Sequence, residues 1–359
     1  MRDLRVLFIT REGRWQPGAR IRSYGLSSQL RKMGFDADVF SFADHLGAKA
    51  GKDEAYFFLR EKTRYAAKGL CCLVRSDRDV FIINRANYHA FPAILASGIK
   101  RAPFIFDMDD WEAREKIGSK AELLTRLLAK RARVCVAASR YLNDYLSQFN
   151  KNVYYLPTGV DLDAFKFKPL SDKDDFVFSW HGSVNRREIL EYTHFLIECF
   201  MCLRERYDFI KLWIAADGIY GGELKKMIEG YRLTGLEYKG WVEPDDVPRY
   251  LEGTSVGLIP LFPDSRFNLS KSPVKLLEYM AAGKPVIASP TGEAKHIVKN
   301  GHNGFLARDK HEFVYYMEEL IKDISLARNL GMNGRTSIEK EYSLEGMGRE
   351  LYQIIMGNL

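Results

Sequence analysis

The sequence contains few cysteines, and their arrangement argues against both a structural zinc site and a disulfide framework. Among 359 residues there are five, and no C-x-x-C pair has a second pair with which it could hold zinc. Their odd number and apolar neighbours favour free thiols. We therefore expect a reducing compartment, the cytoplasm. The five are Cys71, Cys72, Cys135, Cys199 and Cys202.

Long apolar runs are absent as well. No stretch approaches the roughly 18 apolar residues that a membrane-spanning helix needs. The first ten residues, MRDLRVLFIT, have the pattern of a β-strand and lack the apolar region of a signal peptide. We expect neither a spanning helix nor a secretory leader.

Several cofactor and catalytic signatures are also missing. A strand followed by G-x-G-x-x-G does not occur, which disfavours a nicotinamide cofactor. His89, His181 and His296 lack the spacing of metal ligands, and His296 fits a solvated helix position. There is no Ser-His-Asp or paired-glutamate pattern, and no aromatic-basic module for nucleic acid. We expect no cofactor, no metal and no nucleic-acid partner.

The patterns that are present indicate two α/β domains. A chain of this length, 46% hydrophobic, can form two cores. Apolar strand patterns alternate with helical patterns from end to end, as in doubly wound parallel sheets. The polar stretch GVDLDAFKFKPLSDKDD separates the two series. We predict one Rossmann-like domain over residues 1–168, another over 172–335 and a helical C-terminal segment over 336–359.

Residues 271–289, KSPVKLLEYMAAGKPVIAS, read as a helix followed by a strand. Ser272 is a good N-cap, Pro273 fits the first helical position, and Gly283 ends the helix. Lys275 and Glu278 flank the apolar face near the first turns, where the helix dipole favours an anion. The segment could bind a phosphate and a hydroxyl, or it could be an ordinary helix with a solvated Glu-Lys pair.

Two turns after predicted strands combine glycine with arginine. In FITREGRWQPGARIRSYG, Gly18 permits close approach of a ligand, while Arg14 and Arg20 offer forked donors to phosphate or carboxylate. The alternative is a long solvated loop. In SWHGSVNRREILEY, Gly182 and Ser183 precede a helix whose start carries arginines that could neutralise a diphosphate. We expect one of these, Arg186 or Arg187, to point inward and the other to be solvated.

Six motifs, in order and at plausible spacing, resemble those of the retaining, nucleotide-sugar-dependent glycosyltransferases of family 4. The resemblance covers essentially the whole chain. It implies the GT-B fold, with two Rossmann-like domains facing an interdomain cleft and a C-terminal helix crossing back to the first domain. The motifs are PTGVDLDAF at 157–165, WHGS at 180–183, YKGWVEPDDVPRYL at 238–251, VGLIPL at 256–261, KSPVKLLEYMAAGKPVIAS at 271–289 and GEAKHIVKNGHNGFLA at 292–307.

The resemblance also implies a site. Glu278 matches the second acid of the family's E-x7-E element, which binds the donor ribose. The leaving diphosphate would be stabilised by fixed cations, with no metal. The implied catalytic residues are Arg186, Arg187, Lys275 and Asp109. The implied donor-binding residues are Gly18, Gly182, Ser183, Val242, Ser270, Lys271, Ser272 and Glu278, and Arg14 and Arg20 lie on the acceptor or phosphate side.

The sequence departs from the family pattern at two positions. Ser270 stands eight residues before Glu278, where the family has its first acid, and Asp264 is the nearest acid that could replace it. Asp109 stands where many relatives have a sugar-contacting histidine. Asp107 and Asp109 also form a D-x-D pattern, which in other transferases holds a divalent metal, and this interpretation remains an alternative.

The chain is basic, with a net charge of +7, which favours anionic partners. Residues 56–75 and 120–134 interleave cations with apolar residues. They could be helices that lie on the inner face of the cytoplasmic membrane, or helices with solvated faces. Such docking would suit a lipid-linked or cell-envelope glycan acceptor. The donor implied by resemblance is a nucleotide sugar, UDP being the commonest nucleotide in the family.

These observations indicate a metal-independent, hexosyltransferase-type glycosyltransferase of polysaccharide biosynthesis. One alternative is a non-catalytic GT-B protein that binds a nucleotide sugar or a polyanion, having lost the first acid. The other, a nicotinamide or nucleic-acid protein, lacks a phosphate fingerprint. An assay of donor consumption distinguishes the glycosyltransferase from the non-catalytic binder.

Overall fold

The computed structural model describes residues 4–49, 57–111, 119–168, 170 and 175–359. They form two compact units. The first comprises Met1–Gly159, Ser265–Ser272 and Ser343–Leu359, and the second comprises Val160–Asp264 and Pro273–Tyr342. The domain limits expected at 168, 172 and 335 stay predictions. Residues 169 and 171–174, next to the first two of these limits, lie outside the described residues.

The first unit contains a six-stranded parallel sheet in the order β2-β1-β3-β4-β5-β6. The central strands β3 and β4 are buried along their whole length, because helices cover both faces of the sheet. The strands are β1 (Arg5–Thr10), β2 (Asp36–Ser41), β3 (Val80–Asn84), β4 (Phe104–Met108), β5 (Val134–Ala137) and β6 (Val153–Tyr155).

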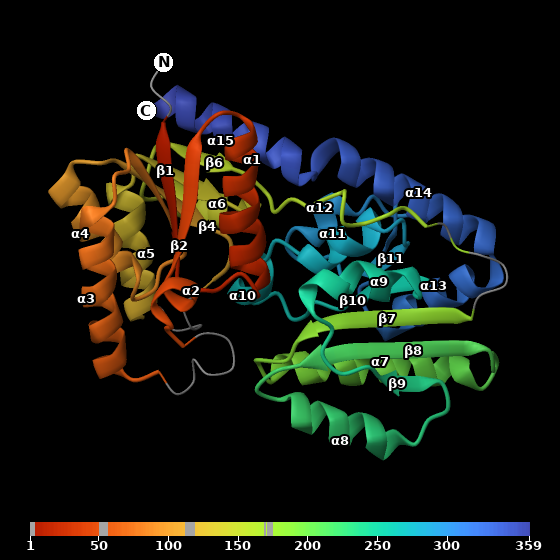
Figure 1. The fold of residues 1–359 in the computed structure, drawn as a ribbon. Coiled ribbons are helices and arrows are strands. Elements are labelled where there is room, and N and C mark those ends of the chain that lie inside the picture. Colours follow the sequence, from red (N-terminus) through yellow and green to blue (C-terminus); the bar gives the residue numbers. More distant parts are fainter. Residues whose placement is uncertain (1–3, 50–56, 112–118, 169, 171–174) are drawn as a thin grey trace. The chain divides into compact units, whose positions relative to one another are not determined.

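Two separate cores lie on the two faces of this sheet (Figure 1). One face is covered by α3 (Leu59–Arg75), α4 (Ala90–Lys100), α5 (Lys120–Arg131) and α6 (Arg140–Ser147). The other is covered by α1 (Leu26–Lys32) and α15 (Leu344–Asn358). The remaining helical segments are the π-helix η1 (Ala19–Gly25), α2 (Phe42–Leu46) and α10 (Arg266–Ser270).

The C-terminal helix α15 belongs to the first unit, as the resemblance implied. It packs against α1, and Leu351 and Ile355 share a core with Leu26 and Leu30. Gly348 permits the close approach, because a Cβ atom there would collide with Cβ of Gln29. The helix begins at a good N-cap, since Ser343 Oγ accepts from the N–H of Gly346 at 3.1 Å.

The second unit has a parallel sheet of the same size, in the order β12-β11-β10-β7-β8-β9. Its strands are β7 (Phe176–Ser183), β8 (Ile210–Asp217), β9 (Leu236–Tyr238), β10 (Val256–Ile259), β11 (Val286–Ala288) and β12 (Phe305–Leu306). Its helical segments are α7 (Glu188–Arg204), α8 (Gly221–Tyr231), η3 (Pro244–Asp246), α9 (Val247–Glu252), α11 (Val274–Ala281), α12 (Ala294–Ile297), α13 (Lys310–Lys322) and α14 (Ile324–Glu341). The predicted fold class, α/β with two doubly wound parallel sheets, is therefore confirmed.

Two local predictions are wrong, and both concern the start of α11. Ser272 is not the N-cap and Pro273 is not the first helical residue, because the helix begins at Val274 with Pro273 at the N-cap and no side-chain cap. The Ser272 hydroxyl accepts a hydrogen bond from the N–H of Thr158 at 3.0 Å instead, so it ties two loops together. The end of the helix is as predicted, since Gly283 has φ +74°.

Every helix in the described part of the chain is too short or too polar to cross a bilayer.

Candidate functional site

The centre of the candidate site in the second unit is a buried contact between a strand and a helix. His181 lies near the end of β7 and Glu278 lies in α11, and both side chains are buried. His181 Nε2 is 3.0 Å from Glu278 Oε2, and His181 Nδ1 is 3.2 Å from the hydroxyl of Tyr279. That hydroxyl is also 2.9 Å from Ser179 Oγ. Glu278 therefore belongs to a four-residue hydrogen-bonded chain.

The donors and acceptors of this chain can be assigned in one consistent direction. A carboxylate only accepts, so Nε2 of His181 carries the proton and donates to Glu278. In the neutral form of the ring, Nδ1 accepts from the Tyr279 hydroxyl, and that hydroxyl can then accept from Ser179. Burial raises the pKa of Tyr279 well above its usual value, so its proton is retained. The arrangement holds the Glu278 carboxylate in one orientation.

Lys275 lies beside the same strand end. It is one turn before Glu278 in α11, and its side chain passes so close to Gly182 that a Cβ atom there would collide with Cε. Gly182 also has φ +152°, which L side chains rarely adopt, so glycine is required on both counts. Lys275 Nζ lies 5.4 Å from the centre of the Trp180 ring. The structure thus brings Gly182, Lys275 and Glu278 together.

The two arginines that open the next helix differ in exposure. Arg187 is exposed, with 74% of its side chain accessible, and its contact with Glu223 is long at 3.5 Å. Such an exposed pair contributes little to stability. Arg186 is half-buried, and Ser183 at the end of β7 is exposed. The expected inward orientation of one arginine stays a prediction.

The remaining predicted donor residues lie in the loop after β9, at the end of α10 and directly after it. Val242 is half-buried against the core of the second unit, and the neighbouring Trp241 is 43% exposed and hence not a core residue. Ser270 is buried, and its hydroxyl donates to the carbonyl of Phe267 at 2.9 Å. Lys271 Nζ lies 3.9 Å from the centre of the Phe267 ring. Asp264, the proposed substitute acid, accepts from the Thr291 hydroxyl at 2.9 Å.

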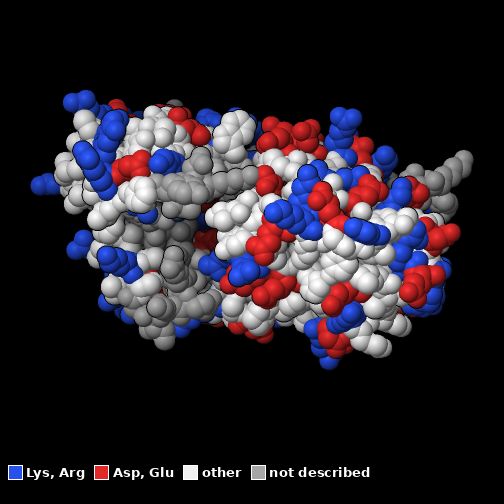
Figure 2. Space-filling model, turned by 90° about the horizontal axis from the view of Figure 1, so that it is seen from below, with Lys and Arg blue, Asp and Glu red and all other residues white. Residues whose placement is uncertain are grey.

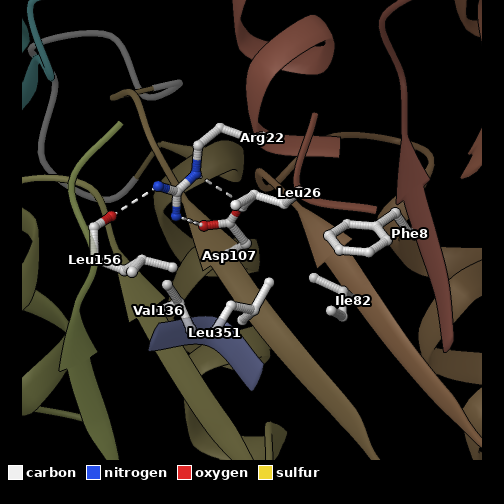
Figure 3. Close-up of a pocket in the computed structure, with 8 residues that line it drawn as sticks. All are labelled: Phe8, Arg22, Leu26, Ile82, Asp107, Val136, Leu156 and Leu351. Carbon is white, nitrogen blue, oxygen red and sulfur yellow. Dashed lines mark hydrogen bonds and ion pairs between the residues drawn. The ribbon is translucent and has the colours of Figure 1, made fainter. Parts of the chain in front are cut away.

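The first unit contains a second polar cluster, at the carboxyl ends of β3 and β4. Asp107, the penultimate residue of β4, is buried and accepts two hydrogen bonds from the guanidinium of Arg22. Arg22 also donates to the carbonyls of Leu156 and Pro157, at 2.7 and 3.1 Å. Figure 3 shows Arg22 between the carboxylate of Asp107 and the carbonyl of Leu156. Burial would lower the pKa of Arg22, but the charge of Asp107 outweighs this and raises it.

Asp109 is held in the same way by Arg85. Arg85 donates through Nε and Nη2, at 2.6 and 2.8 Å, to the two oxygens of Asp109. Nδ2 of Asn84 lies 3.2 Å from both Asp107 and Asp109. Burial would raise the pKa of Asp109, but the charge and hydrogen bonds of Arg85 lower it. A Cβ atom at Gly18 would lie 3.0 Å from Asp109 Oδ2, so glycine lets this loop pass over the pair.

This geometry bears on the D-x-D interpretation. Both carboxylates already accept bidentate hydrogen bonds from arginines, and a metal ion would have to displace these cations. In the described ranges, no three side chains of His, Cys, Asp or Glu come together as a metal site. The space around Arg22 and Asp107 does not admit a water-sized sphere, so it is a packed core. Figure 3 shows the apolar side chains that line it.

Sequence reasoning missed two residues that the structure makes central. Arg22 is the most deeply buried arginine of the arginine-rich loop, in which Arg11 is buried as well. Of the two arginines predicted there, Arg14 is exposed and Arg20 is half-buried. His181 was considered only as a metal ligand. Its position between a buried strand and Gly182 was the available signal, but its partner lies 97 residues away.

The family model that matches this chain covers part of the second unit. Residues 176–323 match the family model described as "Glycosyl transferases group 1". The chain is 27% identical over 189 residues to the "Putative teichuronic acid biosynthesis glycosyltransferase TuaH" of Bacillus subtilis (strain 168), covering 50% of this chain and 45% of that protein. It is 31% identical over 130 residues to the "Uncharacterized glycosyltransferase MJ1178" of Methanocaldococcus jannaschii, covering 34% and 35%. The chain thus spans about half or less of the curated relatives it matches.

Solved structures are similar over the whole chain. HepE of Anabaena, in complex with UDP-glucose, has a TM-score of 0.76 and 17% identity, covering 99% of this chain and 100% of that one. Sucrose-phosphate synthase of Thermosynechococcus elongatus has a TM-score of 0.77 and 16% identity, covering 98% of each chain. At these identities the likeness concerns the fold.

Proposed function

We propose that this chain is a retaining glycosyltransferase of family 4 that uses a nucleotide diphosphate sugar, UDP-linked, and acts in cell-envelope polysaccharide biosynthesis. The observation that carries the proposal is the grouping of Gly182, Lys275 and the His181-bound Glu278 at the carboxyl end of β7. In parallel α/β sheets, ligands bind beyond the carboxyl ends of the strands. This grouping lies within the residues matched by the glycosyltransferase family model.

Each group has a chemical role in the proposal. The Glu278 carboxylate accepts hydrogen bonds from the ribose hydroxyls, since its orientation is set by His181. The Lys275 ammonium, in the first turn of α11, and the N–H groups of that turn bind the diphosphate, where helix dipole and charge act together. Gly182 makes room for the Lys275 side chain at the strand end. Either Arg186 or Arg187 adds a further positive charge near the diphosphate.

The reaction breaks the bond between the anomeric carbon and the diphosphate oxygen. Negative charge develops on the leaving oxygen, and fixed cations stabilise it in the transition state. By resemblance to the family, the acceptor hydroxyl attacks the face that the leaving group departs from, and the leaving phosphate takes the proton of that hydroxyl. This route needs no enzyme nucleophile. It agrees with an Asp109 whose two oxygens are both held by Arg85.

The donor and acceptor are the finer parts of the proposal. HepE was solved with UDP-glucose, which makes UDP sugars the first donors to test. TuaH is described as a teichuronic acid biosynthesis enzyme, which directs attention to envelope glycans or their lipid-linked precursors as acceptors. We place the reaction in the cytoplasm, where nucleotide sugars are the proposed donors.

The test is a thermal-shift panel of UDP, GDP and ADP sugars, followed by a donor-consumption and transfer assay. A ligand that binds only the native state raises Tm. At a ligand concentration a hundred times its Kd, it adds about 2.7 kcal/mol to the free energy of unfolding. A shift with UDP sugars and sugar transfer to an isoprenoid-linked acceptor would support the proposal. The absence of a shift with every nucleotide would overturn it.

The second candidate is a non-catalytic nucleotide-sugar binder. The observation in its favour is the buried Ser270, whose hydroxyl donates to a backbone carbonyl at the position of the family's first acid. In that case UDP raises Tm, but the donor is neither transferred nor hydrolysed.

Metal independence is part of the proposal. We expect metal-stripped protein in EDTA to keep its full transfer rate, because Lys275 and the arginines supply the charge. Loss of activity with EDTA and its recovery with Mg²⁺ or Mn²⁺ would instead favour the D-x-D interpretation.

A further inference from the structure

The helices α3, α4 and α5 present one continuous outer face of the first unit. Leu73 of α3, Ala93 of α4 and Leu128 of α5 belong to the same core, so the three helices lie on the same face of the sheet. α3 packs directly on α4. Along the chain, α3 precedes β3, α4 connects β3 to β4, and α5 connects β4 to β5. Their opposite sides are exposed. We call these outward sides, together, the α3–α5 face.

The middle of the α3–α5 face is an apolar stripe. Phe91, Leu95 and Ile99 follow one another at four-residue spacing on α4, and they are 52%, 56% and 64% exposed. Leu123 on α5 is 56% exposed. Single exposed apolar side chains are common, but a row of three large ones along one helix marks an interaction surface.

Cations line the stripe on both sides. α3 contributes Arg60, Arg64, Lys68 and Arg75 on its exposed side, and α5 contributes Lys120, Lys130 and Arg131. With the half-buried Lys62, Lys100 and Arg126, the three helices carry ten cations.

The same helices carry two acids, Glu61 and Glu122, and Glu122 is buried and bonded to Arg126 at 2.7 Å. Ten cations and two acids give these helices a net charge of +8, whereas the whole chain has +7. The net positive charge of the protein is therefore concentrated here. In Figure 2, Lys and Arg predominate among the charged side chains along the left-hand edge, where Figure 1 places α3 and α4.

We propose that the α3–α5 face docks on an anionic lipid bilayer. Phe91, Leu95 and Ile99 enter the boundary between headgroups and acyl chains, and the cations on α3 and α5 contact lipid phosphates on both sides. The inference goes beyond the transfer reaction and does not depend on it.

Other occupants fit this face less well. A second copy of the chain in a two-fold dimer would set a charge of +8 against the same charge. A nucleic acid would pair its phosphates with the cations but would leave the apolar stripe unused, since phosphate contacts are polar. Only a surface that offers anions at its rim and hydrocarbon beneath them uses both features.

The experiment is co-sedimentation of the full chain with vesicles. One set is pure phosphatidylcholine and the other contains 30% phosphatidylglycerol. We expect binding to the anionic vesicles, weakened by salt, and at least tenfold weaker binding to the neutral ones. Arg64→Gln with Lys68→Gln should weaken partitioning roughly 30-fold, and Leu95→Ser roughly tenfold.

Matched controls lie in the second unit, on α7, on α8 and in the loop before α13. Lys225→Gln with Arg308→Gln removes the same charge, and Met201→Ser removes an exposed apolar side chain. Both should bind anionic vesicles as the native chain does, and melting curves check that all variants fold. Absence of binding to anionic vesicles would overturn the proposal. So would equal losses in the α3–α5 variants and the controls, or binding that ignores Leu95→Ser, which would indicate simple polyanion adsorption.

Discussion

His181 Nε2 donates to Glu278 Oε2 over 3.0 Å, between a strand and a helix that are 97 residues apart in the chain. The two side chains are buried, and Tyr279 and Ser179 extend the hydrogen bonds. His181 therefore orients the Glu278 carboxylate, and the role proposed for that carboxylate is to bind the donor ribose. The first two predictions separate these functions.

Glu278→Ala should weaken UDP binding by about 1.5–3 kcal/mol, because a charge-assisted hydrogen bond to the ribose is lost. Isothermal titration of UDP into both proteins measures the change. Glu341→Ala, which removes an exposed glutamate from α14, is the control and should bind UDP normally. Unchanged affinity in a folded Glu278→Ala protein would exclude the assigned role.

His181→Phe keeps an aromatic ring but removes the bond that orients Glu278. We expect UDP affinity to fall by about 1 kcal/mol, since a phenyl ring has no N–H group that could hold the carboxylate in place. Combining it with Glu278→Ala tests the coupling. If His181 acts through Glu278, the double variant binds UDP no more weakly than Glu278→Ala alone, whereas additive losses would mean that His181 acts independently.

Arg22→Met should destabilise the protein by about 3–5 kcal/mol, because it leaves the buried Asp107 without its cation. Denaturant unfolding measures this change. Adding Asp107→Asn should recover part of the loss, since a neutral amide costs less to bury than a charge. Arg349→Met removes an exposed pair with Glu345 and should change stability little. A similar small effect of Arg22→Met would show that the buried pair is not a structural support.

The five thiols should divide into two reactivity classes. Cys71, Cys72 and Cys202 are exposed, whereas Cys135 and Cys199 are buried, and burial raises the pKa of each buried thiol to about 12. At pH 8 almost no thiolate is present at those two positions. We expect Ellman's reagent to detect three thiols quickly in native protein and five after unfolding. Five fast thiols in native protein would contradict the buried placement.

Much of the fold could be predicted because it follows from local periodicity. Buried runs such as VFIIN and FIFDM are typical of central strands in a covered sheet, and Gly283 ends its helix as expected. Ser272 shows where prediction from local sequence patterns fails. It has the residue type and position of an N-cap, but its hydroxyl meets the N–H of Thr158, a partner that no local pattern reveals.

The candidate site was only partly predictable for the same reason. Glu278 was predicted because it lies beside the apolar face of a predicted helix and matches the second acid of the E-x7-E element, and both signals are local in the sequence. Arg22 lies among several arginines, and its burial depends on Asp107, 85 residues away. Only the tertiary structure distinguishes Arg22 from the exposed Arg14.

The return of α15 to the first unit has a consequence for how the chain is made. A ribosome releases residues 1–159 first, yet the core that Leu26 and Leu30 share with Leu351 and Ile355 cannot close until α15 emerges. All of the second unit is synthesised in between. N-terminal domains usually fold first. On the side of the first sheet that α1 and α15 cover, this order is reversed, because the apolar side chains around α1 stay exposed until the second unit has been synthesised. A nascent chain stalled before α15 is the species that a chaperone would be expected to hold.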